Sequence, residues 1–444
     1  MKLAILGAGV SGLSLARLLH ESGLPLADID LFEADDTVGG LCRSKTVEGF
    51  AYDVSGGHIL FSKDREVMQW MKDCAGGDAA FVRRDRHTKI RFGNRFVHYP
   101  FENGLGDLPD EAKFECLKGY VEAWHARDKH GTTAPSDFAS WIRWRFGPGI
   151  ARHFMDPYNE KIWKRPLAEI SSGWVAGRVP DAPIDDVLKA AIGVRTEGYT
   201  HQAVFFYPKH GGFQAITDGI ARAVSTRVRL STPVRELQRA GEGWRVNGER
   251  FDLVVSTLPL NELPAVVPDM PSSVKEAMQG LAFNSIVTLL VALDRPAHPD
   301  LSWIYLPHHE QGPVNRITYM SNYSPHMAPE GRTSFLFEVT LPGNGPVPGR
   351  ELEDESLGGA VSAGLLHPGE VLFTDRSTCR YAYIVYDHHL MARRKAALSW
   401  CEANGIVPLG RFGRYDYFNS DQCVIAAREL AGKILERART GVHP

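Results

Sequence analysis

The sequence predicts an α/β fold that begins with a strand, a glycine turn and a helix. The strand is the apolar run at residues 3–6, the turn carries Gly7, Gly9 and Gly12, and a helical pattern of leucines follows. A second apolar run at residues 29–32 ends at Glu33, roughly 20 residues after Gly12. Elements in this order, with an acid at that distance, indicate a Rossmann-type domain that binds a dinucleotide.

Each residue of the turn has its own predicted role. Gly7 permits the tight turn, Gly9 lets the backbone approach a pyrophosphate, and Gly12 lets the helix pack closely on the strand. Ser11 lies at the helix N-terminus, where anionic phosphates bind. The Glu33 carboxylate can accept both hydroxyls of an adenosine ribose. An ordinary turn is the alternative interpretation, and the position of the motif and of its acid disfavours it.

A second glycine pair narrows the choice of nucleotide. Gly39, Gly40 and Leu41 lie in a segment that resembles the second glycine pair of the FAD-containing amine-oxidase and protoporphyrinogen-oxidase superfamily. Such a pair lets the chain pass close to a flavin diphosphate, so we predict FAD, with NAD as the alternative. Gly57 and His58 follow in a loop that can approach a planar ring closely. The alternative there is a hairpin with an exposed histidine.

Composition excludes several classes of function. The 444 residues suffice for two or three domains, and the net charge of −3, with both signs mixed, gives no reason to expect nucleic acid or an anionic membrane as a partner. No apolar run is long enough to span a membrane, and the N-terminus does not look like a signal peptide. The six scattered cysteines predict reduced thiols in a cytoplasmic protein. The histidines lack ligand spacing, so we expect no metal.

The remaining elements follow in order along the chain. Residues 91–99 predict paired strands, and the pattern is helical from residue 111 to about 189. A strand is expected at 203–208, followed by a helix toward residue 224, and residues 253–257 predict a buried central strand. Residues 228–230, 234–237 and 244–246 suit a small sheet that covers the Rossmann core. Antiparallel strands are expected at 284–293, 302–306, 316–320 and 334–339, and a loop at 410–413 precedes a helix at 424–434.

These elements predict three parts. Residues 1–90, 205–265 and 405–444 would form a discontinuous FAD-binding domain of the Rossmann type. Residues 102–200 would form a helical insert. Residues 91–101 and 266–404 would form an antiparallel-sheet substrate domain.

Five separated motifs jointly resemble the UDP-galactopyranose mutase family, particularly its eukaryotic-type branch. They are residues 99–101, 154–163, 177–179 and 316–325, and residues 410–413 together with Tyr417. The resemblance runs from the N-terminus to about Asp421, with divergent segments between the motifs. It implies a flavin-dependent isomerase that interconverts pyranose and furanose forms of a nucleotide sugar for polysaccharide or glycoconjugate biosynthesis. In that family N5 of reduced FAD attacks the anomeric carbon without net redox change.

The resemblance also implies roles for individual residues. Arg178 and Arg316 would grip the diphosphate, since guanidinium forks suit a dianionic leaving group. Tyr383 and Tyr417 would donate hydrogen bonds to it, and Tyr323 would line the same cleft. His58 would lie beside the flavin, and Arg411 would contact it. Asn159 and Trp163 would line the sugar side of the cleft. Trp163 could equally pack between helices.

Departures from the family motif concern the base and the sugar. Tyr99 and Phe101 fit the aromatic cradle for uracil, but Glu102 stands where the eukaryotic-type motif usually has Gln. Ionised Glu only accepts hydrogen bonds, which suits a guanine or cytosine edge at least as well as uracil. Gln202 stands where an Asn is expected near the sugar. The base and the sugar therefore remain open.

Two other functions are compatible with the sequence. One is a flavin oxidase or desaturase of the wider superfamily, which predicts an apolar cleft and turnover with oxygen. The other is a non-catalytic nucleotide-sugar or flavin-binding protein, against which a complete flavin pocket with His58 argues. A mutase needs reduced FAD, and NADH or NADPH is the expected reductant, although no separate nicotinamide motif is present. The oligomeric state is open.

Overall fold

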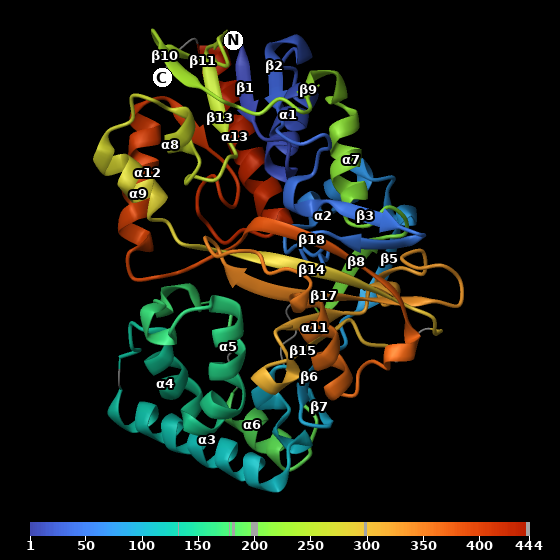
Figure 1. Ribbon diagram of the computed structural model, residues 1–444. Coiled ribbons are helices and arrows are strands. Elements are labelled where there is room, and N and C mark those ends of the chain that lie inside the picture. Colours follow the sequence, from blue (N-terminus) through green and yellow to red (C-terminus); the bar gives the residue numbers. More distant parts are fainter. Residues whose placement is uncertain (132, 177, 180–182, 197–202, 297–299, 441–444) are drawn as a thin grey trace.

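The computed structural model describes residues 1–131, 133–176, 178–179, 183–196, 203–296 and 300–440 (Figure 1). A five-stranded parallel sheet in the order β19-β13-β1-β2-β9 confirms the predicted Rossmann-type unit. Its strands are β1 (Leu3–Leu6), β2 (Ile29–Phe32), β9 (Val228–Arg229), β13 (Leu253–Ser256) and β19 (Ile406–Pro408).

Both faces of this sheet are covered. Leu3 and Ile5 pack into a core with the helices α1 (Val10–Glu21), α7 (Gln214–Arg222) and α13 (Ser420–Thr440). Ala4 and Leu6 point the other way, into a core that includes β11. This alternation follows from the two-residue period of a strand, and it explains the continuously apolar sequence of β1.

The small sheet on the second face corrects one prediction. It consists of β10 (Leu237–Ala240), β11 (Gly243–Val246) and β12 (Glu249–Phe251). Residues 228–230 were expected in it, but β9 pairs in parallel with β2 at the edge of the central sheet. Residues 234–236 lie outside any strand. Short segments of similar β propensity cannot be assigned to a sheet from sequence, because pairing decides.

A seven-stranded sheet crosses the middle of the molecule (Figure 1). Its order is β18 (Val371–Ile384), β14 (Phe283–Leu293), β17 (Thr333–Pro342), β16 (Arg316–Thr318), β15 (Trp303–Tyr305), β6 (Thr88–Phe92) and β7 (Arg95–His98). The expected antiparallel pairing is found between all of these neighbours except β15 and β6, which pair in parallel. The strand predicted to reach residue 320 ends at Thr318, and α10 (Met320–Tyr323) follows.

The predicted helical insert is present below this sheet in Figure 1. It contains α3 (Asp110–His130), α4 (Phe138–Ile150), α5 (Asp156–Trp163) and α6 (Ile184–Ala191), and these helices share an apolar core with Ile90 of β6 and Val97 of β7. The remaining helices are α2 (Arg65–Cys74), α8 (Leu263–Val266), α9 (Ser272–Gln279), α11 (Glu351–Ser362) and α12 (Leu390–Ala403). Two further strand pairs are antiparallel: β3 (Ser44–Val47) pairs with β4 (Phe50–Asp53), and β5 (Phe81–Asp85) pairs with β8 (Val204–Pro208). The residue limits of the three domains stay a prediction.

A buried lysine attaches the helical insert to the seven-stranded sheet. Lys161 of α5 is 2% exposed, and its ammonium donates to the carbonyl oxygens of Leu306 at 3.0 Å and Val314 at 3.2 Å. These two carbonyls lie in the connection between β15 and β16. Burial lowers the pKa of Lys161 to about 7.

This lysine should make stability depend on pH. An exposed lysine of the unfolded chain titrates near about 10.4, so unfolding takes up a proton between about pH 7 and about pH 10. The free energy of unfolding should therefore rise with pH through this window, and Lys161→Met should remove that part of the rise. Urea unfolding near both ends of the window measures it. Equal slopes in the two proteins would contradict this assignment.

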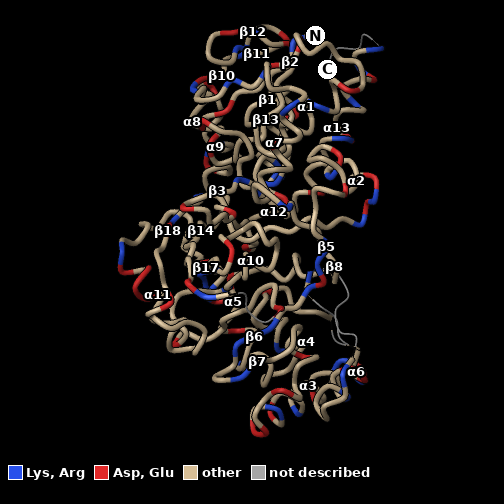
Figure 2. The backbone as a smooth tube through the Cα atoms, turned by 90° about the vertical axis from the view of Figure 1, so that its right-hand side faces the viewer, with Lys and Arg blue, Asp and Glu red and all other residues tan. Residues whose placement is uncertain are grey.

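Lys and Arg are interspersed with Asp and Glu over the whole tube in Figure 2, which agrees with the mixed charge of the sequence. Within the described residues, no helix is both long and apolar enough to cross a membrane. The same residues contain no cluster of three or more potential metal ligands. All six cysteines are free thiols.

Candidate active site

One cavity of about 1210 Å³ is lined by the Rossmann-type unit, the seven-stranded sheet and the helical insert. It brings together nearly all residues that the sequence singled out. These are Gly7, Gly9, Ser11, Glu33, Gly39, Gly40, Leu41, Gly57, His58, Tyr99, Phe101, Glu102, Asn159, Trp163, Arg178, Arg316, Tyr323, Tyr383, Arg411 and Tyr417. Gly12 lies beneath the turn instead, and Gln202 falls outside the described residues.

The glycines around the first turn differ in what they permit. Gly7 has φ +101°, which favours glycine, and a Cβ on Gly12 would lie 2.1 Å from the Gly7 carbonyl oxygen. Gly9 has an ordinary φ of −75°. A Cβ there would face Gly40, with its Cα at 3.9 Å. Gly7 and Gly12 are thus required by the chain itself, whereas Gly9 keeps space open in the cavity.

The polar groups at this end fit a dinucleotide. The Glu33 carboxylate accepts the Ala8 N–H at 2.8 Å and the Asp35 N–H at 3.0 Å, so it is fixed at the end of β2. The Gly39 N–H donates to the Ala8 carbonyl at 2.9 Å, which holds the second glycine pair against the first turn. Two glycine turns side by side, a helix N-terminus and a fixed acid form a suitable cradle for FAD.

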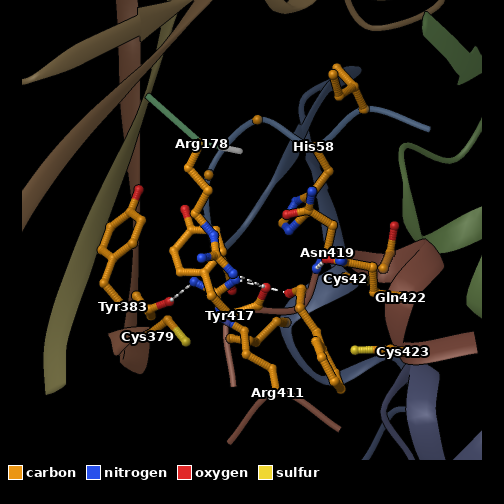
Figure 3. A pocket seen from close by; sticks show the side chains of 18 of the residues that line it. Cys42, His58, Arg178, Cys379, Tyr383, Arg411, Tyr417, Asn419, Gln422 and Cys423 are labelled. Carbon is orange, nitrogen blue, oxygen red and sulfur yellow. Dashed lines mark hydrogen bonds between the residues drawn. The ribbon is translucent and has the colours of Figure 1, made fainter. Parts of the chain in front are cut away.

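Arg411 lies where the C-terminal segment meets the cavity (Figure 3). Its guanidinium donates to the carbonyl oxygens of Phe418 at 2.9 Å and Ala382 at 3.2 Å. Its Nε is buried without a hydrogen-bond partner within the described chain. A buried unpaired donor is rare and costly, so a ligand atom is a natural acceptor for it.

A buried carboxylate holds the loop that carries His58. Glu338 of β17 is 0% exposed and lies opposite Arg316 of β16 in the strand register. Its Oε1 accepts from the Arg316 Nε at 2.8 Å and from the Gly57 N–H at 3.1 Å. The Arg316 Nη2 donates in turn to the Gly57 carbonyl at 3.3 Å. We call Arg316, Glu338 and Gly57 the clasp.

A contact with the strand β16 explains why residue 57 is a glycine. A Cβ there would lie 2.9 Å from two side-chain atoms of Thr318 on β16. The loop therefore packs directly on the strand that carries Arg316, and the sequence did not reveal this contact.

His58 is poised as a neutral group beside the cavity. Burial lowers its pKa, the Arg316 charge acts in the same sense and Asp53 opposes them. Its Nδ1 lies 3.9 Å from the Asp53 carboxylate and has no hydrogen-bond partner within the described chain. A neutral imidazole carries one donor and one acceptor nitrogen, so His58 can hold or accept a proton.

Asp53, at the end of β4, organises this wall and is 0% exposed. Its Oδ1 accepts from the hydroxyls of Ser44 at 2.7 Å and Tyr207 at 2.9 Å and from the Phe213 N–H at 3.1 Å. Its Oδ2 accepts the His58 N–H at 3.1 Å. One carboxylate thus ties the His58 loop to three other segments.

Asp53→Ala should leave these donors without an acceptor and lower the free energy of unfolding by at least about 3 kcal/mol. Urea denaturation measures the loss. Asp36→Ala, at an exposed turn, is the matched control and should change it by less than about 0.5 kcal/mol. A loss at Asp53 no larger than at Asp36 would show that the network does not stabilise the wall.

Arg178 and Tyr417 meet across the mouth of the cavity (Figure 3). The exposed Arg178 guanidinium donates to the Trp174 carbonyl at 2.9 Å and the Tyr417 carbonyl at 3.4 Å. It lies 4.8 Å from the centre of the Tyr417 ring, and Arg411 lies 4.4 Å from the same ring. Two of the predicted cationic groups therefore share one aromatic ring.

The other predicted tyrosines differ in accessibility. Burial raises the pKa of Tyr383, so its hydroxyl stays protonated and can donate into the cavity. Tyr323 lines the cavity but is only 1% exposed, and its ring contacts Phe205 and Tyr207 in the core. Its position supports a role in shaping the wall.

The side chains of Asn159 and Trp163 are joined by a hydrogen bond. The Trp163 indole donates to the Asn159 Oδ1 at 3.2 Å, and the Asn159 amide donates to the Met155 carbonyl at 2.7 Å. Trp163 is 3% exposed and lies edge-on to Trp174, so it also packs between helical segments. Both alternatives considered for Trp163 are compatible with this position.

Sequence reasoning missed Asp53 and Glu338 as members of the site. Glu338 is the only charged residue in the apolar run 334–339, which is an unusual place for a carboxylate. That signal could have been noticed, but its partner Arg316 could not be identified before the pairing of β16 with β17 was known. Tyr158 and Tyr305 were also not singled out, and both line the cavity.

Comparisons with known proteins agree with this geometry. The model of the family described as flavin containing amine oxidoreductase matches residues 10–345. The flavin-containing amine oxidase of Oncorhynchus mykiss is 23% identical over 322 residues, which cover 65% of this chain and 56% of that protein. The coproporphyrinogen III oxidase of Mycobacterium tuberculosis is 23% identical over 339 residues, which cover 71% of this chain and 72% of that protein.

Solved structures extend the similarity to nearly the whole chain. A crystal structure of reduced UDP-galactopyranose mutase superposes with a TM-score of 0.90 at 27% identity, covering 98% of this chain and 95% of that one. A putrescine oxidase superposes with a TM-score of 0.65 at 19% identity, covering 98% and 99%. The second likeness concerns the fold alone.

Proposed function

The chain belongs to the flavin-containing amine oxidoreductase family, and from this premise we propose that it is an FAD-dependent mutase that interconverts the pyranose and furanose forms of a nucleotide-diphosphate sugar. The full-length likeness to a UDP-galactopyranose mutase supports this reaction over an oxidation. The eukaryotic-type branch stays part of the proposal.

The observation that carries the proposal is the set of guanidiniums around the cavity. Within the described residues, the Arg178 and Arg411 guanidiniums donate hydrogen bonds to main-chain carbonyls and have no carboxylate partner. Three other guanidiniums that line the cavity are paired with carboxylates, Arg316 with Glu338, Arg43 with Asp35 and Arg380 with Glu262. Uncompensated cations would repel a protonated amine, whereas they attract a diphosphate.

These residues can assist departure of a nucleotide diphosphate. The charge that develops on the leaving group would be stabilised by guanidiniums already oriented by protein contacts, so little reorganisation is needed. Arg316 is oriented by the clasp and Arg178 by Trp174 and Tyr417. The Tyr383 hydroxyl adds a donor, and aromatic side chains line the same cavity.

The flavin, when bound and reduced, supplies the nucleophilic ring nitrogen for the anomeric carbon. His58, which lines the cavity, would hold or accept a proton on its imidazole ring while the sugar ring opens and closes. NADH or NADPH is the proposed reductant. The second candidate is an oxidase or desaturase, which the names of the sequence relatives favour.

Anaerobic turnover distinguishes the two candidates. Purified holoenzyme reduced with dithionite is incubated with UDP-, GDP-, CDP- and TDP-sugars, and the products are separated by anion-exchange chromatography. A new peak of unchanged mass, absent with oxidised flavin, is expected. If none of the nucleotide sugars yields such a peak, and amines reduce the flavin in a separate sample of oxidised holoenzyme, the protein is an oxidase.

A further inference from the structure

Glu102 is a buried carboxyl group in the wall of the cavity that the proposed reaction leaves without a role. It lies in the short 3₁₀ turn η4 (Phe101–Asn103), and it lines the cavity although it is only 4% exposed. Its Oε1 has no hydrogen-bond partner within the described residues. An isolated buried carboxylate oxygen is costly, which indicates that a ligand donor completes it.

The side chains around this turn form an aromatic surface. The Phe101 and Phe154 rings stack 4.9 Å apart at 9°, and Phe154 and Tyr158 stack 5.3 Å apart at 10°. Tyr99 and Tyr305 continue the wall with centroids 5.4 Å apart. All five line the cavity, but Phe101 is 0% exposed and Phe154 is stacked between Phe101 and Tyr158, so the half-buried Tyr99, Tyr158 and Tyr305 present the accessible rings. Planar heteroaromatic rings stack favourably on such surfaces, by about 1–3 kcal/mol per nucleobase.

A nucleobase stacked here would present an edge to the carboxylate. Cytosine, guanine and adenine each carry an exocyclic amino group, which donates hydrogen bonds. Uracil and thymine carry a carbonyl oxygen at the corresponding position, which a carboxylate repels, and the one donor on that edge is the imide N–H beside it. The carboxylate therefore distinguishes bases by the presence of an amino group.

We propose that Glu102 selects the nucleobase, so that the site takes nucleoside diphosphates with an amino-bearing base in preference to those of uracil or thymine. This inference rests on the proposed function, because the guanidiniums of Arg178 and Arg316 are taken to hold the diphosphate. It differs from a simple likeness to the structural neighbour, whose name specifies UDP.

Protonation should modulate this choice. Burial raises the pKa of Glu102 to about 7, although Arg145 of α4 opposes the shift. Tyr120 of α3 also interacts with this carboxyl. The elements that pack on η4 further include β7, η5 (Leu105–Asp107) and α6, whose titratable or charged groups are Arg95, His98, Asp107, Asp185, Asp186 and Lys189. A protonated Glu102 has an O–H donor beside its carbonyl oxygen, as an amide has an N–H donor. Lowering the pH should therefore raise the affinity for UDP relative to the amino-bearing diphosphates.

The test is a binding ranking with the holoenzyme. Isothermal titration calorimetry at about pH 8 measures CDP, GDP, ADP, UDP and TDP against wild type and Glu102→Gln. At least one amino-bearing diphosphate should bind wild type about 10-fold more tightly than UDP and TDP, an effect of about 1.4 kcal/mol. The amino-bearing diphosphate that binds most tightly shows whether the site prefers cytosine, guanine or adenine. The isosteric Gln should shift the ranking about 10-fold toward UDP.

Two comparisons keep the result interpretable. Glu276→Gln changes an exposed carboxylate on α9 and should leave the ranking unchanged. For wild type alone, lowering the pH to about 6 should move the ranking in the same direction as Glu102→Gln, which gives a second readout if that variant does not fold.

Three outcomes have separate meanings. UDP binding more tightly than every amino-bearing diphosphate at about pH 8, or the same ranking in wild type and Glu102→Gln, would overturn the inference. Failure of all five to bind would overturn it together with the diphosphate site. A holoenzyme that shows the expected ranking but converts no nucleotide sugar would contradict the proposed reaction alone.

Discussion

Arg316→Ala should lose both turnover and stability. Loss of a charged contact to the diphosphate is expected to cost about 2–5 kcal/mol of transition-state stabilisation, which is a factor of about 30 or more in kcat/KM. The same change leaves Glu338, which is 0% exposed, without its cationic partner. Breaking a buried ion pair from one side typically costs about 3–5 kcal/mol of folding free energy. Steady-state kinetics and urea denaturation measure the two effects.

A double variant separates folding from catalysis. Arg316→Met combined with Glu338→Gln removes both charges, so stability should return toward wild type, because a neutral pair avoids the unpaired buried carboxylate. Turnover should stay low. If the double variant recovered turnover as well, Arg316 would serve the fold and not the substrate.

Arg178→Ala is the matched comparison on the exposed side of the cavity. Its exposed guanidinium contacts the Trp174 and Tyr417 carbonyls and the Tyr417 ring, so the free energy of unfolding should change by less than about 1 kcal/mol. Turnover should fall as for Arg316→Ala. Unchanged turnover in both single variants would remove the diphosphate assignment.

Gly9→Val should abolish flavin binding while leaving the fold intact. The φ of −75° at Gly9 suits any residue, and the nearest atom to an added Cβ is the Gly40 Cα at 3.9 Å. The valine would instead occupy the space between the two glycine turns that the cofactor needs. Flavin absorbance per protein should fall to background, and the melting temperature should match that of flavin-stripped wild type.

Gly12→Ala provides the contrasting case. Its Cβ would overlap the Gly7 carbonyl oxygen at 2.1 Å, so the strand, turn and helix could not pack as they do. This variant should lower the melting temperature of the flavin-stripped protein itself. Full flavin content in Gly9→Val would show that the cofactor does not pass between Gly9 and Gly40.

The sequence predicts the Rossmann-type unit well because its signals are local. The glycine spacing, the apolar period and Glu33 all lie within the first 33 residues. The strand β18 was not predicted, although it has 14 residues. Its centre is polar and half-buried, and it forms because β14 pairs with it along its length. Such strands are determined by a partner and not by their own composition.

The same limit applies to the site. Motifs identified the residues that face the cavity, because their types reflect ligand chemistry. The residues that hold them, Asp53 and Glu338, are single carboxylates whose meaning depends on partners up to 281 residues away. Only the fold brings Glu338 to Gly57, and sequence spacing contains no trace of that contact.

The different exposure of the two arginines has a consequence for how salt affects binding. Arg178 lies at the mouth in contact with solvent, whereas Arg316 is paired in the interior. Dissolved ions screen exposed charges strongly and enclosed charges weakly. Added salt should therefore slow the encounter with an anionic ligand while changing its residence time much less, because steering acts before contact and the inner contacts act after it.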